Sequence, residues 1–530
     1  MTKKRFLTGV LAIALVFGMT VVGCDEEEDP IIKVDNTIYS VSISLGYGND
    51  IPKVGNTLTT TVRNISGLSV SGVSYQWKRA DSQYSTFVNI SNATSSSYTL
   101  TIEDTGKYIK VQAINSDTTP PVESTAVGPV DANQVAKPTA DPAGGDVVSG
   151  QEIILTSTTE STIIRYTLDG TNPTSSSNLY SSSSKPTITS SCTLKAIATK
   201  NFMVDSEVLS VSYTVVAAPS FSSVTSSASI LNNGIYSVTY GNSRYVAGGN
   251  GNIAYSTNGT TWTASTGNSN FLVKGIAYGT QFIAVGYGNS GGVINYSSDG
   301  TSWTNATDVT FGTSYINNVA YGGGRYVAVG EDGKIAYSID GSSWTAVSDS
   351  TFGTSTIYGI TYGAGKFVAV GVGGKMAYST NGTTWTAVTS SSFTSTINGI
   401  TYGGPSGNEK FIAVGNSGVS SYQIAYSTDG ITWTRISQYF DGGLLGSLKR
   451  VAWGGNKFVT VASSGVMYFS LDGTYWAKIE GGTGTGKSQF DTGNYSSIQD
   501  IVYGGGKFLA VGSKSTGLLD NPTGEMAISN

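Results

Sequence analysis

The sequence contains no histidine among its 530 residues, and this absence excludes several kinds of chemistry at once. Catalysis by a Ser-His-Asp or Cys-His pair needs an imidazole as the base, and many metal sites need one as a ligand. Cysteine is almost as scarce, with only Cys24 and Cys192. We therefore expect no disulfide framework, no metal site and no cofactor. Cys192 lies in an alternating apolar run and is interpreted as a buried structural thiol.

Charge is also sparse, since only 12% of the residues are charged and the formal net charge is −5. Nucleic-acid-binding proteins need a basic surface, and no basic cluster occurs beyond the first five residues, so we expect no nucleic-acid partner. Glycine is abundant, with 68 residues, and Ser, Thr and Tyr accompany it. This composition is typical of turn-rich β structure, and the length indicates several domains.

A long apolar run occurs only near the N-terminus, at residues 6–23, directly after a short basic segment. This order is typical of an export signal. Val21-Val22-Gly23-Cys24 resembles a bacterial lipobox, which implies that residues 1–23 are a signal peptide and that Cys24 is lipidated. An uncleaved membrane helix is the alternative, because 18 apolar residues are just long enough to span a bilayer.

Residues 24–36 follow as an acidic tether. The resemblance to a lipoprotein implies a membrane partner, reached through the lipid, and a place in the bacterial cell envelope. We favour the outer membrane or cell surface. The aspartate directly after Cys24 resembles an inner-membrane retention signal of some bacteria, so the inner membrane stays open.

Residues 37–132 are predicted to form a small β-sandwich. Alternating apolar and polar side chains indicate strands at 39–45, 58–62 and 73–77. The pattern resembles the immunoglobulin-like modules of bacterial surface proteins. That resemblance makes Trp77 the core tryptophan and Asp104-x-Gly106-x-Tyr108 a tyrosine corner. We interpret this module as a spacer.

Residues 133–216 are predicted to form a second small β-sandwich. Its centre reads Tyr166-Thr167-Leu168-Asp169-Gly170-Thr171-Asn172-Pro173, in which Asp-Gly signals a tight turn and the proline ends the extended run. This core is similar to the chitobiase/β-hexosaminidase C-terminal domain family. Such modules accompany carbohydrate-active proteins without supplying catalytic residues, so the resemblance implies a glycan context and assigns no site.

An eight-residue motif, aromatic-Ser-x-Asp/Asn-Gly-x-x-Trp, occurs six times between residues 255 and 476. Successive tryptophans are 41, 41, 41, 48 and 43 residues apart. A period near 41 residues, made only of strand and turn signals, predicts a β-propeller in which each repeat forms one four-stranded blade. The Asp-Gly or Asn-Gly pair supplies the positive φ of a hairpin turn, and the tryptophan is expected to be buried between blades.

The two ends of the repeat array predict how the ring closes. The last repeat stops at Asn530, before its outer strand, and Phe221 lies 41 residues ahead of the first tryptophan, where an outer strand is expected. Residues 219–225 should therefore complete the last blade, which removes an open sheet edge. The expected fold class is all-β, with two small β-sandwich modules followed by a seven-bladed β-propeller at residues 217–530.

The repeated motif resembles the Asp-box of sialidase-like and BNR-repeat propellers, in which the box is a structural turn. A sialidase also needs three arginines that converge on a substrate carboxylate. Arg244 and Arg325 occupy a repeat position that is lysine in four other blades, which leaves only Arg435 and Arg450 free. No local motif indicates the paired carboxylates of a glycosidase. We therefore predict no catalytic residues and no enzyme activity.

Residues 481–488, Gly-Gly-Thr-Gly-Thr-Gly-Lys-Ser, fit the pattern of a phosphate-binding P-loop. That motif functions between a buried strand and a helix whose amide groups hold the phosphates. The residues that follow show no helical periodicity, so we interpret the segment as a glycine-rich loop.

Four connections are longer than the repeat requires: 416–422, 438–447, 480–497 and 513–525. All four are predicted on one face of the propeller, and insertions gathered on one face often mark a binding surface. Ordinary loop variation is the alternative. Aromatic residues beside short polar groups suit sugar or peptide recognition. The candidate ligand-binding residues are Tyr439, Phe440, Asp441, Lys487, Gln489, Asp491, Tyr495, Lys514 and Asp520.

Together these features predict a lipid-anchored envelope protein that presents a non-catalytic propeller for ligand binding or adhesion, with a glycan or a protein as the ligand. One alternative is a divergent glycoside hydrolase or lyase acting on a polysaccharide, which would place clustered carboxylates at the propeller axis. A scaffold for envelope assembly is the other alternative.

Overall fold

The computed structural model of the chain describes residues 35–45, 51–131, 133–224, 231, 233–267, 271–307, 309–416, 422–438, 447–479, 497–514 and 523–529. These residues form strands, turns and a few single-turn 3-10 helices, which confirms the predicted all-β class. Among them, no helix has the length and apolar character needed to cross a membrane. Cys24, the acidic tether up to residue 34 and the P-loop-like segment lie outside the described residues.

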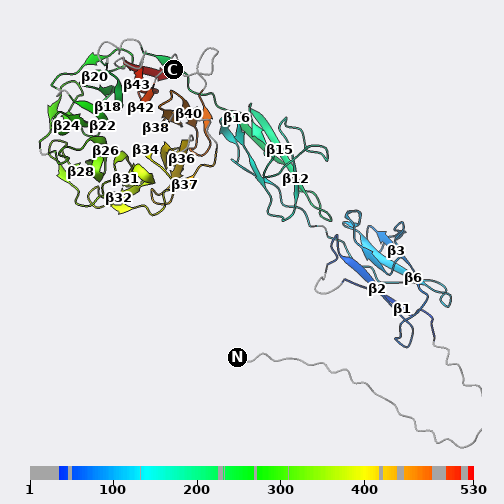
Figure 1. The fold of residues 1–530 in the computed structure, drawn as a ribbon. Helices are drawn as coiled ribbons and strands as arrows, with labels where there is room; N and C mark the ends of the chain where they lie inside the picture. The colour runs from blue at the N-terminus through cyan, green and yellow to red at the C-terminus, as the bar shows by residue number, and fades with distance from the viewer. Residues whose placement is uncertain are drawn as a thin grey trace, which may run out of the picture. The chain divides into compact units, whose positions relative to one another are not determined.

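The chain divides into two compact units, Met1–Val135 with Lys200–Asp205, and Ala136–Thr199 with Ser206–Asn530. The first unit contains a three-stranded and a four-stranded sheet (Figure 1). In sheet order the strands are β1 (Ser40–Ser44), β2 (Thr57–Arg63) and β5 (Ser97–Thr99), then β4 (Val88–Asn89), β3 (Ser74–Ala80), β6 (Tyr108–Ile114) and β7 (Val122–Glu123).

One hydrophobic core joins the two sheets of the first unit. It includes Leu58 of β2, Trp77 of β3 and Val111 of β6, each with no exposed surface. The indole nitrogen of Trp77 donates a 2.9 Å hydrogen bond to the carbonyl of Ser95, so its one polar atom is satisfied inside the core. The predicted role of Trp77 as the core tryptophan is confirmed.

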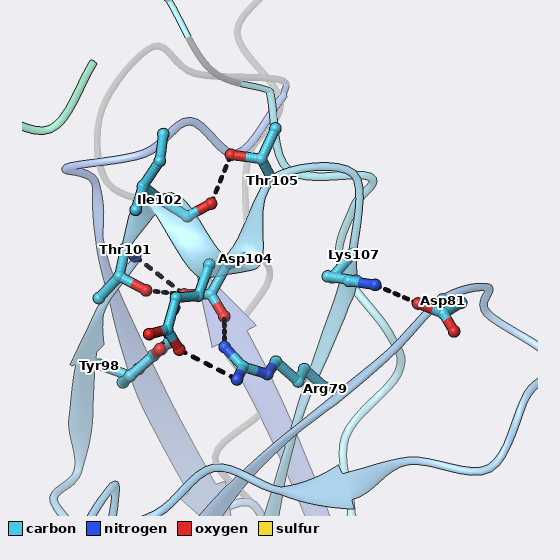
Figure 2. A network of polar contacts seen from close by, with 9 residues as sticks. Arg79, Asp81, Tyr98, Thr101, Ile102, Asp104, Thr105 and Lys107 are labelled. Carbon is cyan, nitrogen blue, oxygen red and sulfur yellow. Dashed lines mark hydrogen bonds and ion pairs between the residues drawn. The ribbon is translucent and has the colours of Figure 1, made fainter. Parts of the chain in front are cut away.

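A buried carboxylate organises one corner of this unit, where Asp104 ends the short helix η1 (Ile102–Asp104) (Figure 2). Its oxygens accept hydrogen bonds from the Tyr98 hydroxyl at 2.7 Å, the Thr101 amide at 2.8 Å and the Arg79 guanidinium at 3.2 Å. Burial and the hydrogen bond to Asp104 raise the pKa of Tyr98 to about 12. The predicted corner motif runs through Tyr108, whereas the hydroxyl bonded to Asp104 is that of Tyr98.

The second unit begins with a small module built on a five-stranded sheet. In sheet order its strands are β13 (Asn178–Leu179), β12 (Ile163–Thr167), β15 (Cys192–Thr199), β16 (Leu209–Val215) and β9 (Gly145–Val147). Two two-stranded sheets accompany it, pairing β11 (Ile154–Thr156) with β8 (Thr139–Asp141) and β10 (Gln151–Glu152) with β14 (Thr187–Ile188).

Cys192 is the first residue of β15, and its predicted burial is wrong. The covered face of this strand runs through Leu194, Ala196 and Ala198, which are fully buried. Cys192 shares that face by the two-residue period of a strand, yet it lies at the edge of the core and is only half-buried. Its thiol is free, and partial burial raises its pKa.

Residues from Phe221 onward form a β-propeller, in which the described residues make seven four-stranded sheets (Figure 1). The innermost strands are β18 (Ile235–Gly241), β22 (Leu272–Tyr278), β26 (Ile316–Gly322), β30 (Ile357–Gly363), β34 (Ile397–Gly403), β38 (Leu448–Gly454) and β42 (Ser497–Gly504). Each contacts the innermost strand of the next sheet, and β42 contacts β18, so the sheets form a ring.

Each innermost strand pairs with a second strand, and the second with a third. The second strands are β19 (Arg244–Gly249), β23 (Phe282–Gly288), β27 (Arg325–Gly330), β31 (Lys366–Gly371), β35 (Lys410–Asn416), β39 (Lys457–Ala462) and β43 (Lys507–Lys514). The third strands are β20 (Ile253–Ser256), β24 (Gly291–Ser297), β28 (Ile335–Ser338), β32 (Met376–Ser379), β36 (Tyr422–Ser427), β40 (Met467–Ser470) and β44 (Thr523–Ser529).

The outer strands are short because the turn formed by the repeated motif occupies most of the connection that leads to them. They are β21 (Thr263–Ala264), β25 (Thr304–Asn305), β29 (Thr345–Ala346), β33 (Thr386–Ala387), β37 (Thr434–Arg435) and β41 (Ala477–Lys478). The seventh sheet takes its outer strand from the other end of the sequence, as the repeat spacing predicts. There β17 (Phe221–Ser223) pairs antiparallel with β44, and Phe221 lies opposite Ser529.

Candidate functional site

A cavity of about 370 Å³ lies on the axis of the propeller. It forms because each innermost strand carries a β-bulge near its start, where one residue is left without a partner on the second strand. A bulge redirects the side chain of the extra residue. The bulged residues that line the cavity are Tyr236, Lys274, Asn317, Tyr358, Asn398, Lys449 and Gln499.

Four further residues complete the described lining: Thr396, Asn416, Ser447 and Arg450. Thr396 and Ser447 directly precede innermost strands, and Asn416 ends the second strand β35. The cavity, hereafter the axial pocket, therefore lies at the end of the ring where outer-to-inner and second-to-third connections meet. This is the face on which the long connections were predicted, and Asn416 and Ser447 flank two of them.

Arg450 is anchored within the ring by its neighbours. Its guanidinium donates hydrogen bonds to the carbonyl of Asn398 on the preceding blade and, at 3.1 Å, to that of Lys449. It also forms a long ion pair with Asp500 at 3.9 Å. Most contacts of the Arg450 guanidinium are therefore made with the protein itself, and these contacts hold it beside the axial pocket.

Asp500 connects the last blade to the first. One of its oxygens accepts hydrogen bonds from the Ser237 hydroxyl and the Val238 amide, both at 3.0 Å, and the other accepts one from the Ile501 amide at 2.9 Å. Burial raises the pKa of Asp500 in spite of the opposing charge of Arg450. Its carboxylate is therefore occupied by structural contacts at the closure of the ring.

Lys274 and Lys449 differ from Arg450, because neither ammonium group forms a hydrogen bond or ion pair with the residues that the structure describes. The Lys274 nitrogen lies 5.1 Å from the ring centre of Tyr236, a cation–π contact. Burial lowers the pKa of both lysines, and the charge of Arg450 lowers it further in each case. Lys274 also lowers the pKa of Lys449, and Glu331 acts in the opposite direction on Lys274.

Side-chain amides connect adjacent blades around the axial pocket. Asn317 donates a 3.0 Å hydrogen bond to the carbonyl of Ile357, and Asn398 donates one of 2.7 Å to that of Leu448. In both cases the acceptor is the first residue of the common repeat in the next innermost strand. These contacts fix the orientations of the two amides, so the ring itself holds this part of the pocket lining in place.

The structure tests the predicted ligand-binding residues only in part. Lys514 ends β43, and its ammonium group forms a 3.8 Å ion pair with Glu525 on the neighbouring β44. It is absent from the described lining of the axial pocket. The remaining eight lie outside the described residues: Tyr439, Phe440, Asp441, Lys487, Gln489, Asp491, Tyr495 and Asp520.

Sequence reasoning did not identify the axial pocket. It singled out Arg450 as an arginine outside the repeat pattern, but it missed Lys274 and Lys449. A signal was present, because one position near the start of each innermost strand varies among Tyr, Lys, Asn and Gln, while the residue directly before it stays Ile, Leu or Val. A polar, variable column inside an apolar strand marks side chains that leave the packed interior.

This arrangement supports binding of an anionic, hydrogen-bonding ligand. None of the described residues lining the pocket is Asp or Glu, so the described lining offers no carboxylate pair for glycoside hydrolysis. In the described part of the chain, no group of three or more Cys, Asp or Glu side chains is placed to hold a metal ion.

The fold and the pocket define the class of the molecule as an all-β protein with a propeller and a polar axial pocket. Comparison with known families adds one assignment, since residues 142–210 match the family described as the chitobiase/beta-hexosaminidase C-terminal domain. This confirms the resemblance seen in the sequence of the second module. Comparison with curated proteins finds no match.

Among solved structures, the chain is similar to YCF48 from Cyanidioschyzon merolae, with 15% identity and a TM-score of 0.43 over 59% of this chain and 98% of that one. It is similar to YCF48 bound to D1 peptide, with 14% identity, a TM-score of 0.43 and the same coverage. The WD40 β-propeller domain of Doa1 gives 12% identity and a TM-score of 0.43 over 59% of this chain and 97% of that domain.

Proposed function

We propose that this chain is a lipid-anchored cell-envelope protein whose propeller binds a glycan or protein ligand without chemical turnover. In this proposal residues 1–23 direct export, Cys24 carries the lipid and residues 24–36 are the tether. The modules at 37–132 and 133–216 then act as a stalk for a seven-bladed propeller at 217–530. The lipobox-like sequence supports the anchor, and we favour the outer membrane or cell surface as the location of the protein.

The axial pocket is the single observation that best supports a binding role. Its lining side chains come from all seven blades, and inter-blade hydrogen bonds hold two of them, Asn317 and Asn398. These two amides are oriented before a ligand arrives, which reduces the entropy cost of binding. The described lining also lacks the acidic residues that hydrolysis of a glycan would need.

A divergent glycoside hydrolase or lyase is the second candidate. It is favoured by the match of residues 142–210 to a domain family named after hexosaminidases. This alternative predicts release of reducing ends from a polysaccharide by the whole chain. A reducing-end assay over a panel of polysaccharides distinguishes the two, because a non-catalytic binder retains the polysaccharide and leaves its chain length unchanged.

A glycan array and a protein-binding screen, both with the whole chain, test the proposed function. We expect a restricted set of ligands to be retained. A chain that binds nothing in either screen would count decisively against the binding role.

A further inference from the structure

We propose that the axial pocket binds an acidic sugar, with Lys274 and Lys449 contacting its anionic group and the amide and tyrosine side chains contacting its hydroxyl groups. This inference rests on the proposed binding function and names the ligand chemistry of that site. It follows from the charge, the lining and the size of the pocket.

The two lysines come from β22 and β38, which lie on nearly opposite sides of the seven-membered ring. Even so, both lysines line one pocket with Arg450, and the charge of Arg450 lowers the pKa of each. The charge of Lys274 also lowers the pKa of Lys449. Partly buried like charges repel one another more strongly than charges in water. An anion placed between them would relieve this repulsion, and charge-assisted hydrogen bonds are among the strongest polar contacts.

Both ammonium groups are available to such an anion, since no described residue takes their hydrogen bonds. Arg450 is different, because its hydrogen bonds go to two carbonyl groups and its ion pair to Asp500. Asp500 balances Arg450, which leaves Lys274 and Lys449 as the excess positive charge of the site. Glu331, which acts on Lys274, is outside the described lining.

The rest of the lining favours a sugar over an acidic peptide. None of the described lining residues is Leu, Ile, Val, Met or Phe, whereas peptides are commonly anchored by apolar side chains in apolar pockets. Tyr236 and Tyr358 offer aromatic faces together with hydroxyl groups, and Asn317, Asn398 and Gln499 offer amides. A volume of about 370 Å³ lies within the range of small-molecule sites.

Calorimetric titration of the whole chain tests this inference with three probes: trigalacturonate, the neutral maltotriose and a hexaglutamate peptide. We expect trigalacturonate to bind and the other two to fail. A sulfated trisaccharide, tested in parallel, distinguishes a carboxylate from a sulfate as the anionic group. Either acidic sugar supports the proposal. Equal binding of the neutral sugar, binding of the peptide alone, or no binding of any acidic sugar would overturn it.

Lysine variants locate the interaction. Lys274→Gln and Lys449→Gln should each weaken binding of the acidic sugar by about 10-fold or more, because each removes a charge-assisted contact. Lys457→Gln is the matched control, since Lys457 begins β39 at the opposite end of its blade and should leave binding unchanged. Circular dichroism confirms that the variants fold. Acidic-sugar binding that survives both pocket substitutions would contradict the assignment of the site.

The same variants separate this inference from the proposed function. If the double variant K274Q/K449Q keeps its ligands in the glycan and protein screens, the binding role stands and the axial pocket is the wrong site. If the unsubstituted chain binds nothing in any screen, the binding role itself fails.

Discussion

Asp299 shows how one side chain holds the turn of a repeat. Its carboxylate accepts hydrogen bonds from the Thr301 amide at 2.9 Å and the Thr301 hydroxyl at 2.6 Å, while the Ser297 hydroxyl holds the Gly300 amide at 2.8 Å. In the first copy, the side-chain oxygen of Asn258 accepts hydrogen bonds from the Thr260 amide at 2.9 Å and the Thr261 amide at 2.8 Å. An amide oxygen can therefore replace the carboxylate as the acceptor. The repeated Asp or Asn of the motif stabilises the turn.

The aspartates of the repeated motif should make the stability of the fold depend on pH. Hydrogen bonds from the Thr301 side chain and from the Ser343 amide, each the largest cause at its site, lower the pKa of Asp299 and Asp340 to about 2. At Asp429 burial opposes the shift, but amide hydrogen bonds still lower its pKa to about 2. A depressed pKa stabilises the fold above the unfolded value of 3.8, and that stability is lost as pH falls towards 2.

The triple variant D299N/D340N/D429N should therefore fold at neutral pH and lose less stability between about pH 4 and pH 2. Urea unfolding at a series of pH values measures this. The control D131N/D146N/D205N changes three exposed carboxyl groups outside the repeated motif. It should lose more stability than D299N/D340N/D429N as the pH falls. If the two triple variants lost the same free energy of unfolding at low pH, the hydrogen bonds of the motif aspartates would contribute nothing to its pH dependence.

At the scale of elements, the innermost strands are joined by contacts between a glycine and an aromatic ring. A Cβ atom at Gly322 would lie 2.0 Å from Cγ of Tyr362 on the next blade, and one at Gly504 would lie 2.0 Å from Cγ of Tyr240 on the first blade. The contact recurs at each junction between described blades. The glycine-aromatic pairs are Gly241–Tyr278, Gly279–Tyr321, Gly322–Tyr362, Gly363–Tyr402, Gly403–Trp453, Gly454–Tyr503 and Gly504–Tyr240.

Gly322→Ala should destabilise the propeller by about 3 kcal/mol or more, because the added methyl group has no space. Gly324→Ala is the control, since a Cβ there meets nothing within 4 Å and costs only the strain of its φ of +79°, about 1–2 kcal/mol. In the double variant G322A/Y362A the cost should be less than the sum of the two single costs. Additive costs in chemical denaturation would show that the two residues are not in contact.

The pairing of β17 with β44 joins the two ends of the propeller sequence. Ser222 lies opposite Ile528 in this ladder, so a cysteine at each position should form a disulfide on oxidation and raise the unfolding temperature. The experiment uses S222C/I528C in a C192S background, and the single variant S222C is the control. Crosslinks that form only between molecules, seen by non-reducing electrophoresis, would contradict the intramolecular pairing.

The strands could be predicted from the sequence because the repeat restates the same local signals in each blade. The second strands begin at Arg244, Arg325 and Lys366, where the repeat alignment placed them. The bulge at the start of each innermost strand could not be predicted, since it depends on pairing between strands and leaves only a polar column in the sequence. For that reason the sequence did not predict the pocket, and the candidate ligand-binding residues were placed on the long connections instead.

At the scale of the whole molecule, we propose an anchor, a stalk and a binding propeller. The proposed anchor is a lipid on Cys24, which begins the acidic tether, and the only other cysteine in the sequence is Cys192. In a bacterial host, Cys24→Ser should move the protein from the membrane fraction to the soluble fraction and abolish palmitate labelling. Cys192→Ser is the matched control and should change neither. A C24S protein that stays in the membrane and is still labelled would contradict lipidation at this residue.

We propose above all that the ring of bulged residues forms a binding site for an acidic sugar. The most direct measurement is a crystal structure of the whole chain grown with trigalacturonate. We expect a uronate in the axial pocket, with its carboxylate about 2.7–2.9 Å from the ammonium nitrogens of Lys274 and Lys449. A sugar bound elsewhere on the chain, with the axial pocket filled only by water, would contradict it.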